Sequence, residues 1–530
     1  MSRGYWGEPR PADVVHSPPN STPRFRPRPA GSHISQGRSM DSLRIAFLTP
    51  EVAPFAKVGG LADVSAALPR ELQRAGHDVR VFMPLYQRIT EGGHASVPVP
   101  GLEGIPIKLG ARTVSFSVRQ AMLPGGDLAI HLIDCPELYA RPGVYTQDAD
   151  EHLRFILLTR AAIEVCQRMA FAPDVLHAND WQTGLAPLYL KSAYAWDQLF
   201  HRTRSVLTIH NLGYQGLFGA SIAGDLGLGD AAHLLHQEDL RAGRIGFLKH
   251  GLLYADALTT VSPTYAREIQ TEQLGMGLQD VLRRRADALT GILNGVDPSE
   301  WDPRFDPLIP QRYSEKSLWR KEKNKQALLA ALGLPYDEGV PVAGIVSRLT
   351  AQKGFELLAG SLPALLEARD FRFAVLGTGE VKYEEFFARL QQRFPGKVCF
   401  YRGFSNELAH LIEAGADLFV MPSLYEPCGL NQLYSLKYGT IPVVRRTGGL
   451  ADTVEPWNPA TAEGTGFVFE HFTPEGLAWA LGAALDAWTD RAAWRKLQKN
   501  AMARDFSWRH QAAEYVALYT RLVAPERAHA

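Results

Sequence analysis

The stretch Leu-Arg-Ile-Ala-Phe-Leu-Thr at residues 43–49, with Lys-Val-Gly-Gly-Leu-Ala-Asp-Val close behind it at residues 57–64, indicates the fold of this chain. The first segment is short and apolar, as a buried strand is. After the glycine pair, apolar residues recur at helical spacing from Leu61 to Leu72 and predict a helix that packs against this strand. Pro69 lies within the pattern, so we expect it to kink the helix.

The same alternation of short apolar runs and longer helical stretches continues along the chain. A helix is expected from His152 to Met169. Strands of the first half are predicted at Leu43–Thr49, Val79–Met83, Val175–His177, Val206–Ile209 and Ala257–Val261. Strands of the second half are predicted at Val342–Val346, Phe373–Leu376, Val398–Tyr401, Leu418–Met421, Ile441–Val444 and Phe467–Phe469. This rhythm predicts an α/β protein of two Rossmann-like, doubly wound lobes, with ligands bound beyond the carboxyl ends of the strands in a cleft between the lobes.

The composition excludes several classes of function. Lysine plus arginine and aspartate plus glutamate both number 56, so the chain lacks the basic footprint of a nucleic-acid binder. No apolar run approaches the roughly 20 residues that cross a bilayer, so no membrane span is expected. Four scattered cysteines, with no Cys-x-x-Cys pair, argue against a zinc site or a disulfide scaffold and favour a reducing, cytoplasmic location.

The two lobes are expected at residues 40–293 and 294–506. The boundary is placed there because turn-forming residues cluster at Asn294–Pro298. Beyond it, the charged stretch Lys316–Lys325 is predicted to be a solvated helix.

Both ends of the chain differ from the lobes. Residues 507–530 form a final segment, which is amphipathic over Trp508–Leu522. Residues 1–39 are rich in proline and arginine and lack the apolar core of a signal peptide, so we expect a disordered extension. A transit peptide is the weaker alternative, and Met40 is a candidate start of translation.

The pentapeptide Gly-Gly-Leu-Ala-Asp occurs twice, at Gly59–Asp63 and at Gly448–Asp452, each time soon after a predicted strand. Paired glycines in this position can bring backbone N–H groups and a helix N-terminus against a phosphate, and Lys57 would add a positive charge to the first loop. The alternative is a chance repeat, with a surface lysine beside an ordinary helix start. We expect the two loops to contact one phosphorylated ligand from opposite sides.

Two strands of the first half end in polar residues. The run from His177 to Gln182 closes one of them, where Asp180 could hydrogen-bond hydroxyl groups and Trp181 could present an apolar face to a sugar. The alternative is that Asp180 caps a helix. His210 ends the next strand, where a lone histidine is more often a structural group than a catalyst.

The second half carries charges that suit a diphosphate. Arg348 and Lys353 follow a predicted strand, and an arginine fork with a lysine charge can neutralise a leaving diphosphate. Gly377–Gly379 follows another strand but lacks the third glycine of a dinucleotide fingerprint. Glu426 lies in a loop rich in proline and glycine after an apolar strand, which is typical of a functional residue.

Together these motifs resemble those of bacterial glycogen synthases and the related plant starch synthases, from about residue 43 to residue 520. The matching motifs are Lys57–Val64, His177–Trp181, His210–Gly216, Asn294–Asp297, Arg348 with Lys353, and Glu426–Leu430. The resemblance implies the GT-B fold, in which two Rossmann-like lobes face a central cleft and a C-terminal helix crosses back to the first lobe. It also implies transfer of glucose from ADP-glucose to the non-reducing end of an α-1,4-glucan, such as glycogen or a maltooligosaccharide, with retained anomeric configuration. No metal or other cofactor is expected.

The family's roles, transferred to the matching positions, give two sets of candidate residues. The catalytic set comprises Glu426 facing the donor sugar, Lys353 and Arg348 at the leaving ADP, and His210 and Asp180 near the glucosyl unit and the acceptor. The substrate-binding set comprises Lys57, Gly59 and Gly60 at the donor phosphates, Thr447, Gly448 and Gly449 closing over them, Phe404 on the adenine, and His177, Asn294, Cys428, Gly429 and Leu430. Relatives often have histidine at the positions of Asn179 and Gln182, which leaves the details of acceptor binding open.

The sequence is also compatible in part with three other functions. The run Asp148-Ala149-Asp150 matches the metal-binding motif of single-lobe glycosyltransferases, although acidic residues there also favour the start of a helix near Glu151. A Rossmann oxidoreductase would share the order of strands and helices but needs a complete Gly-x-Gly-x-x-Gly turn. A non-catalytic glucan-binding or sugar-nucleotide-sensing protein could keep the fold, although the charged residues of the site are all present.

Overall fold

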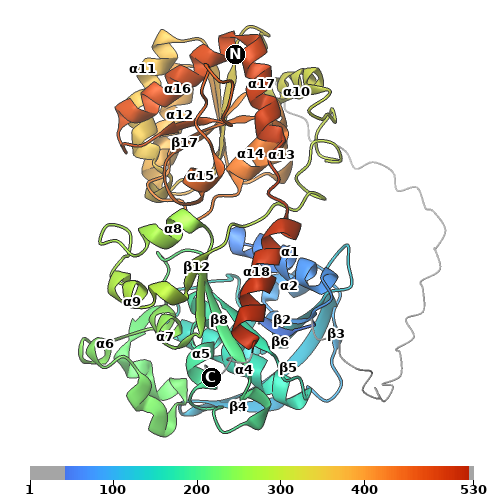
Figure 1. Ribbon diagram of the computed structural model, residues 1–530, viewed down its shortest axis with the longest axis vertical. Helices are drawn as coiled ribbons and strands as arrows, with labels where there is room; N and C mark the ends of the chain where they lie inside the picture. The colour runs from blue at the N-terminus through green and yellow to red at the C-terminus, as the bar shows by residue number, and fades with distance from the viewer. Residues whose placement is uncertain (1–41, 525–530) are drawn as a thin grey trace, which may run out of the picture. The chain divides into compact units, whose positions relative to one another are not determined.

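Two sheets of mostly parallel strands organise the chain. The computed structural model describes residues 42–524 (Figure 1), so the expectations for residues 1–39, for Met40 and for the last six residues lie outside the described part. The first sheet has ten strands in the order β12-β11-β8-β7-β1-β2-β6-β5-β3, with β4 paired to β5. The second has six parallel strands in the order β15-β14-β13-β16-β17-β18. The two-lobed α/β fold expected from the sequence is confirmed.

Most parallel strands occur where the apolar runs predicted them, but β6 and β12 of the first sheet were not predicted. In the first sheet they are β1 (Arg44–Leu48), β2 (Asp78–Pro84), β6 (Ala129–Asp134), β7 (Val175–Asn179), β8 (Arg204–Ile209), β11 (Ala257–Thr260) and β12 (Leu289–Gly291). In the second they are β13 (Val342–Val346), β14 (Arg372–Gly377), β15 (Val398–Arg402), β16 (Leu418–Met421), β17 (Ile441–Arg445) and β18 (Phe467–Phe469). Apart from the edge strands β12 and β15, these strands are almost continuously buried because helices cover both faces, so they read as apolar runs.

An antiparallel edge of the first sheet was not predicted. It consists of β3 (Val97–Pro98), β4 (Ile105–Leu109) and β5 (Arg112–Met122), and β5 pairs antiparallel with β6. A separate antiparallel pair joins β9 (Leu217–Gly219) to β10 (Arg244–Gly246). In β4, apolar side chains alternate with exposed ones, so the strand lacks the continuous apolar run by which the parallel strands were found.

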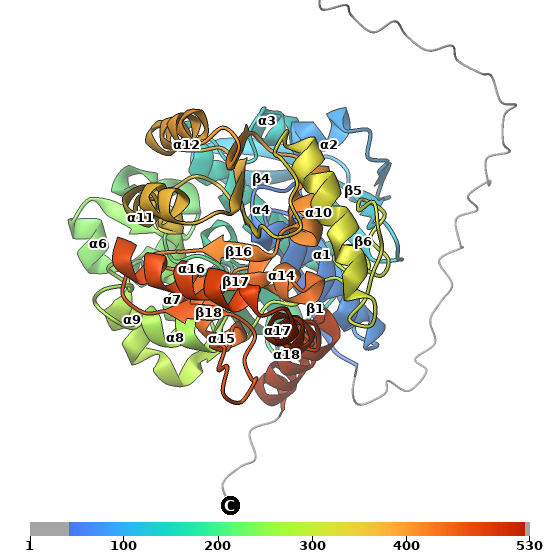
Figure 2. The ribbon, with the colours of Figure 1, turned by 90° about the horizontal axis from the view of Figure 1, so that it is seen from above.

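Helices cover both faces of the second sheet (Figure 2). One face packs against α11 (Phe355–Ala368), α12 (Val381–Arg393), α16 (Pro474–Thr489) and α17 (Arg491–Met502). The other packs against α10 (Lys321–Ala331), α13 (Asn406–Gly415), α14 (Asn431–Tyr438) and α15 (Gly448–Thr453). Each face has its own apolar core, as expected for a doubly wound sheet.

The last helix returns to the first lobe. α1 (Gly60–Arg74) continues through Pro69, and α18 (Trp508–Val523) lies beside it in Figure 1. Aromatic residues of α18, among them Tyr515 and Tyr519, are part of the first-lobe core. The other helices of this lobe include α4 (Glu151–Arg168), α5 (Ala186–Leu190), α7 (Phe247–Tyr254), α8 (Pro263–Glu268) and α9 (Gln279–Arg284).

The two segments that join the lobes lie side by side. Val296 N–H donates to Phe506 O at 2.8 Å, and Val296 forms a parallel bridge with Ser507. A Cβ on Gly295 would lie 2.7 Å from the backbone of Trp508, so only glycine permits this approach. The two segments that connect the lobes, around Val296 and around Ser507, are therefore in direct contact.

The order of the strands fixes where the site must be. In the first sheet the chain adds β2 and β6 on one side of β1 and then places β7 on the other side. In the second sheet the same reversal occurs between β13 and β16. Crevices open at the carboxyl ends of strands where the order reverses. The loops after β1 and β7, and after β13 and β16, are therefore expected to form the binding site.

The expectation of a solvated helix at Lys316–Lys325 is wrong. Lys321 and Lys325 are buried where α10 meets α13. Lys321 Nζ donates to the carbonyls of Glu413 and Ala414 at 3.0 and 2.9 Å, and burial lowers its pKa to about 7. Charge alone could not reveal these buried partners.

Asp148 and Asp150, which match a metal-binding motif in sequence, both form ion pairs with Arg141, and this disfavours the metal-binding alternative.

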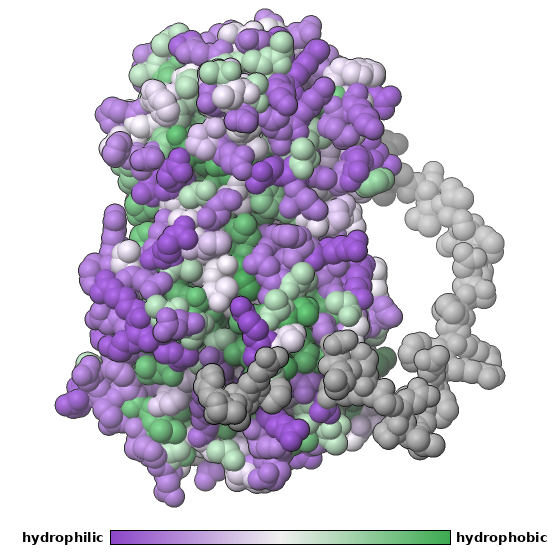
Figure 3. Space-filling model, in the orientation of Figure 1, coloured by the Kyte–Doolittle hydropathy of each residue, from purple (hydrophilic) through white to green (hydrophobic). Residues whose placement is uncertain are grey.

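No helix within residues 42–524 is long and apolar enough to span a membrane. On the face shown in Figure 3, hydrophilic residues predominate and apolar ones lie in small separate patches.

Candidate active site

A cavity of about 650 Å³ lies between the carboxyl ends of the two sheets. Its walls include loops that follow β1, β7, β8 and β12 in the first lobe and β13, β14, β15 and β16 in the second. The volume is within the range of small-molecule sites. The structure brings together these candidates from the sequence on its walls: Lys57, Gly59, Gly60, Asp180, His210, Asn294, Arg348, Lys353, Phe404, Glu426, Cys428, Gly429 and Leu430.

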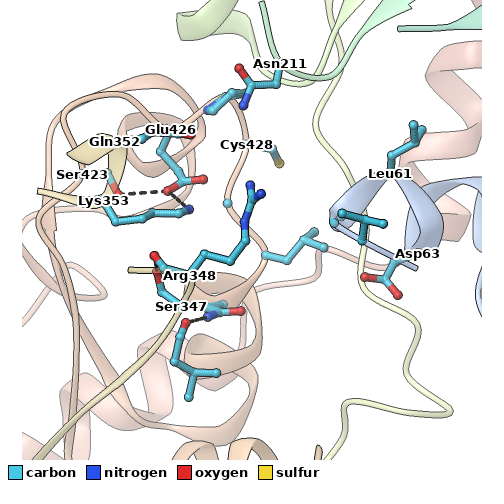
Figure 4. Close-up of a pocket in the computed structure, with 18 of the residues that line it drawn as sticks. Leu61, Asp63, Asn211, Ser347, Arg348, Gln352, Lys353, Ser423, Glu426 and Cys428 are labelled. Carbon is cyan, nitrogen blue, oxygen red and sulfur yellow. Dashed lines mark hydrogen bonds and ion pairs between the residues drawn. The ribbon is translucent and has the colours of Figure 1, made fainter. Parts of the chain in front are cut away.

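An ion pair between half-buried Lys353 and buried Glu426 forms the second-lobe wall (Figure 4). Lys353 Nζ lies 2.6 Å from Glu426 Oε2, which also accepts a hydrogen bond from Ser423 Oγ at 2.9 Å. Glu426 is only 5% exposed, so its carboxylate depends on these two partners. Gln352 Nε2 donates to Tyr425 O and the Gln352 carbonyl accepts from Leu424 N–H, so the loops after β13 and β16 hold each other.

Arg348 is the free cation of this wall. Within residues 42–524 its guanidinium makes no hydrogen bond or ion pair, and in Figure 4 it extends into the open space of the cavity. An exposed arginine with all its donors unused, five residues before Lys353, can bind an oxyanion with two parallel hydrogen bonds.

The first-lobe wall is built around Glu51. Its Oε2 accepts hydrogen bonds from Val58 N–H at 2.6 Å and Gly59 N–H at 3.2 Å, and its Oε1 accepts a short one from Tyr145 OH. Burial raises the pKa of Glu51. Gly59 N–H therefore binds a carboxylate of the protein, contrary to the expectation that it faces a phosphate; Gly60 lies opposite Leu430 of the second lobe.

Lys57 is held at the rim of the cavity. Its ammonium lies 2.7 Å from Asp63 Oδ1, the aspartate of the first Gly-Gly-Leu-Ala-Asp repeat. Burial raises the pKa of Asp63, and the charge of Lys57 opposes that rise. Because Lys57 stays partly exposed, its remaining donors can reach a ligand.

Asp180 orders the loop after β8. Its Oδ1 accepts hydrogen bonds from His210 N–H at 2.6 Å and Asn211 N–H at 3.4 Å. Asp180 has φ +55°, a strained value for a residue with a side chain, so the surrounding contacts impose its conformation. Burial raises its pKa to about 7. The structure places Asp180 as an organiser of the cavity wall and not as a helix cap, since its side chain makes no capping hydrogen bond.

His210 is held in one tautomer by Asn179. Asn179 Nδ2 donates to Leu48 O at 2.9 Å, so Asn179 Oδ1 is the acceptor that faces His210 Nε2 at 2.9 Å. His210 is therefore protonated on Nε2 and can accept a hydrogen bond at Nδ1. Burial lowers its pKa to about 3, which keeps the ring neutral.

Two buried amide oxygens on the cavity wall have no partner within the described residues, Asn294 Oδ1 and Gln182 Oε1. Buried acceptors are normally hydrogen-bonded, so these two indicate a ligand with hydroxyl donors. Phe404 also lines the cavity and is 78% exposed, which is unusual for a phenylalanine and suits stacking on a flat ring.

Four expected binding residues lie outside the cavity wall. His177 lies on β7 and is fully buried, and its ring nitrogens meet Thr208 Oγ1 of β8 and Tyr519 OH of α18 at 2.6 Å each. It is a structural residue, and the expectation that it binds substrate is wrong.

The other three are Thr447, Gly448 and Gly449. Thr447 Oγ1 and Gly448 N–H donate to the carboxylate of Glu268, at 2.9 and 3.1 Å. In this structure a glutamate occupies the place that the sequence predicted for a phosphate, so the second loop does not face the cavity.

Sequence reasoning missed several residues of the cavity. Glu51 lies three residues after β1, Tyr145 precedes α4, and Ser423 precedes Glu426 by three residues. Asp63 was part of the quoted repeat but was given no role. Of these, only Glu51 carries a signal in the sequence, a carboxylate in the loop that follows a parallel strand.

Two facing Rossmann-like lobes with a cavity between them are the architecture of GT-B glycosyltransferases. Residues 44–284 match the family model described as starch synthase catalytic domain, and residues 333–501 match glycosyl transferases group 1. The chain belongs to the glycogen and starch synthase family.

Similar proteins cover nearly the whole chain. A glycogen synthase of Anaeromyxobacter dehalogenans strain 2CP-1 is 45% identical over 92% of this chain and all of the relative, and one of Myxococcus xanthus is 44% identical over 91% of this chain and all of the relative. The catalytic domain of starch synthase IV from Arabidopsis thaliana, bound to ADP and acarbose, has a TM-score of 0.84 at 32% identity and covers 91% of this chain and 100% of that one. A sucrose-phosphate synthase from Thermosynechococcus elongatus, with a TM-score of 0.56 at 20% identity over 91% of this chain and 99% of that one, shares the fold.

Proposed function

We propose that this chain transfers glucose from ADP-glucose to the non-reducing end of an α-1,4-glucan in glycogen synthesis. The observation that carries the proposal is the second-lobe wall, where Arg348 has no protein partner within residues 42–524 and Lys353 lies beside it. Two cations on one wall suit a leaving diphosphate. The starch synthase IV structure was solved with ADP and acarbose, which supports a nucleotide and a glucan as ligands here.

In this reaction the cations neutralise the charge that grows on the diphosphate as the C1–O bond breaks. The acceptor's 4-hydroxyl attacks C1 from the face that the diphosphate leaves, and a phosphate oxygen takes the hydroxyl proton. The new bond forms where the old one was, so the configuration at C1 is retained. This route needs no nucleophile from the protein, unlike that of a retaining glycosidase.

The remaining polar groups position the sugar. Glu426 Oε1 has no partner within the described residues and would accept a hydroxyl hydrogen of the donor glucose. His210 Nδ1 would accept another from the opposite wall. Phe404 would stack on the adenine, and the unpaired amide oxygens of Asn294 and Gln182 would bind sugar hydroxyl groups.

We also propose that the reaction occurs in the cytoplasm and requires no metal. The four cysteines are all free thiols, which suits a reducing compartment. A non-catalytic sugar-nucleotide sensor is not favoured, since the relatives that match over their full length are glycogen synthases.

Elongation of a maltooligosaccharide with ADP-glucose or UDP-glucose, with and without excess chelator, tests the proposal. We expect elongation with ADP-glucose in both conditions, and its loss in Arg348→Ala. Product from UDP-glucose alone would refute the donor assignment, and loss of product in chelator would refute a metal-free reaction. Binding of ADP-glucose without elongation would favour the sensor.

A further inference from the structure

The second Gly-Gly-Leu-Ala-Asp loop is held by the first lobe. Glu268, the last residue of α8, accepts hydrogen bonds from Thr447 Oγ1 and Gly448 N–H at the start of α15. Near the start of α8, Thr264 donates its N–H and its hydroxyl to Asp452 at 2.8 and 2.6 Å. α8 therefore binds α15 at both ends.

The loop held in this way supports the segment that carries Glu426. Gly449 N–H is shared between the carbonyls of Glu426 and Pro427, at 3.1 Å each. Gly448 has φ +44°, and a Cβ there would lie 1.9 Å from Glu426 O, so only glycine fits. Ser262, the N-cap of α8, donates its hydroxyl to Pro427 O at 2.7 Å. The backbone of Glu426 is thus fixed from α15 and from the first lobe together.

Side chains of the same segment enter the first lobe. Tyr425 packs against the first-lobe core, and Cys428 is a member of it. On the other side, Arg445 donates to the carbonyls of Ser423 and Leu424. The position of Glu426 therefore depends on contact between the lobes.

We propose that Glu268 is a positioning residue, which sets the backbone of the Glu426 segment through α15 only when the two lobes are in contact. Glu268 does not line the cavity, so it acts through Thr447 and Gly448 and not on a substrate. The inference rests on the proposed glucosyl transfer, and it explains how lobe contact is coupled to catalysis: the carboxylate at the reacting sugar is correctly placed only in the state that excludes water.

The test compares Glu268→Ala and Glu268→Gln with Glu272→Gln. Glu272 is a matched control, because it lies four residues further along and pairs at the surface with Arg283 at 2.9 Å. We expect Glu268→Ala to lower kcat about tenfold to a hundredfold and to leave the Kd for ADP within about twofold, since Arg348 and Lys353 are untouched. Glu268→Gln keeps one acceptor oxygen, so its kcat should fall less than that of Glu268→Ala. Hydrogen exchange of residues 448–453 should be faster in Glu268→Ala than in the control.

Thr447→Val completes the test. If Thr447 acts through Glu268, adding Thr447→Val to Glu268→Ala lowers kcat no further. A kcat for Glu268→Ala equal to that of the control overturns the proposal, as does a Kd for ADP that rises in step with the loss of kcat. A rise in the Kd for ADP in Thr447→Val alone would indicate that Thr447 contacts the phosphates of the ligand, which also overturns the proposal. If the wild-type protein elongates no glucan, the proposed function fails, while equal exchange in Glu268→Ala and wild type would separately refute the role of Glu268 in ordering α15.

Discussion

Replacing Lys353 by alanine tests the chemistry of the second-lobe wall most directly. The substitution removes the ammonium that lies 2.6 Å from Glu426 Oε2 and leaves that oxygen with Ser423 Oγ as its remaining partner. Removing one partner of a fully buried pair costs about 3–5 kcal/mol. Because 21% of the Lys353 side chain is exposed, water can replace part of the lost interaction, and we expect a loss of about 1–3 kcal/mol in the free energy of unfolding.

The effect on catalysis should be larger than the effect on stability. One preorganised donor at a developing negative charge is worth about 3–4 kcal/mol, so kcat should fall about 10²- to 10³-fold. The assay is the initial rate of ADP release at saturating ADP-glucose and maltooligosaccharide, with calorimetric unfolding in parallel. Lys353→Arg keeps the positive charge, so its kcat should lie between those of wild type and Lys353→Ala.

Lys382→Ala is the control for general loss of positive charge. Lys382 is 62% exposed on α12 and pairs with Glu380 at 3.0 Å, away from the cavity wall. Its removal should leave kcat unchanged. A Lys353→Ala enzyme with kcat within about threefold of wild type would refute the role of this cation at the leaving diphosphate.

Three further predictions concern residues that the structure separates into binding and structural roles. Phe404→Ala should raise the Kd for ADP about tenfold, as expected for a lost stacking contact, and should not change the unfolding midpoint because the ring is exposed; an unchanged Kd by calorimetry would contradict the stacking. His177→Ala should lower the free energy of unfolding by about 2–4 kcal/mol in denaturant titration, while kcat of the folded enzyme stays near wild type; a selective loss of activity would return His177 to the site. Burial raises the pKa of Asp180 to about 7, so between about pH 4 and 7 the folded state keeps a proton that the unfolded chain releases, and this group's contribution to stability falls as pH rises. Asp180→Asn lacks this dependence, so its stability relative to wild type should increase from pH 4 to 7, and a constant difference would argue against the raised pKa.

The sequence predicts most of the fold because buried parallel strands have a simple signature. Strands such as β13 and β16 are short apolar runs with both faces covered, and their bounds were predicted correctly. The edge strands β3 to β5 have a mixed pattern, and their pairing is decided by the neighbouring strand β6. The burial of Lys321 was equally invisible, because its partners Glu413 and Ala414 lie more than 90 residues away in sequence.

The candidate site shows the same division. Arg348, Lys353 and Glu426 were identified from their positions after strands, since strand ends determine which residues reach the cleft. The two glycine loops were both predicted to bind phosphate. In the structure, their backbone N–H groups donate hydrogen bonds to the carboxylates of Glu51 and Glu268. A backbone donor shows no preference in sequence between a phosphate and a carboxylate of the protein, so tertiary structure had to decide.

The return of α18 to the first lobe has a consequence for biosynthesis. The first-lobe core includes Tyr515 and Tyr519, and the buried ring of His177 has one of its two partners on this helix. A ribosome that has completed β12 has therefore made every strand of the first sheet but not the helix that closes it. Domains generally fold as units during synthesis, yet this lobe cannot complete its core until the second lobe has been translated. The order of synthesis thus makes the second lobe the first that can finish folding, and the N-terminal lobe the last.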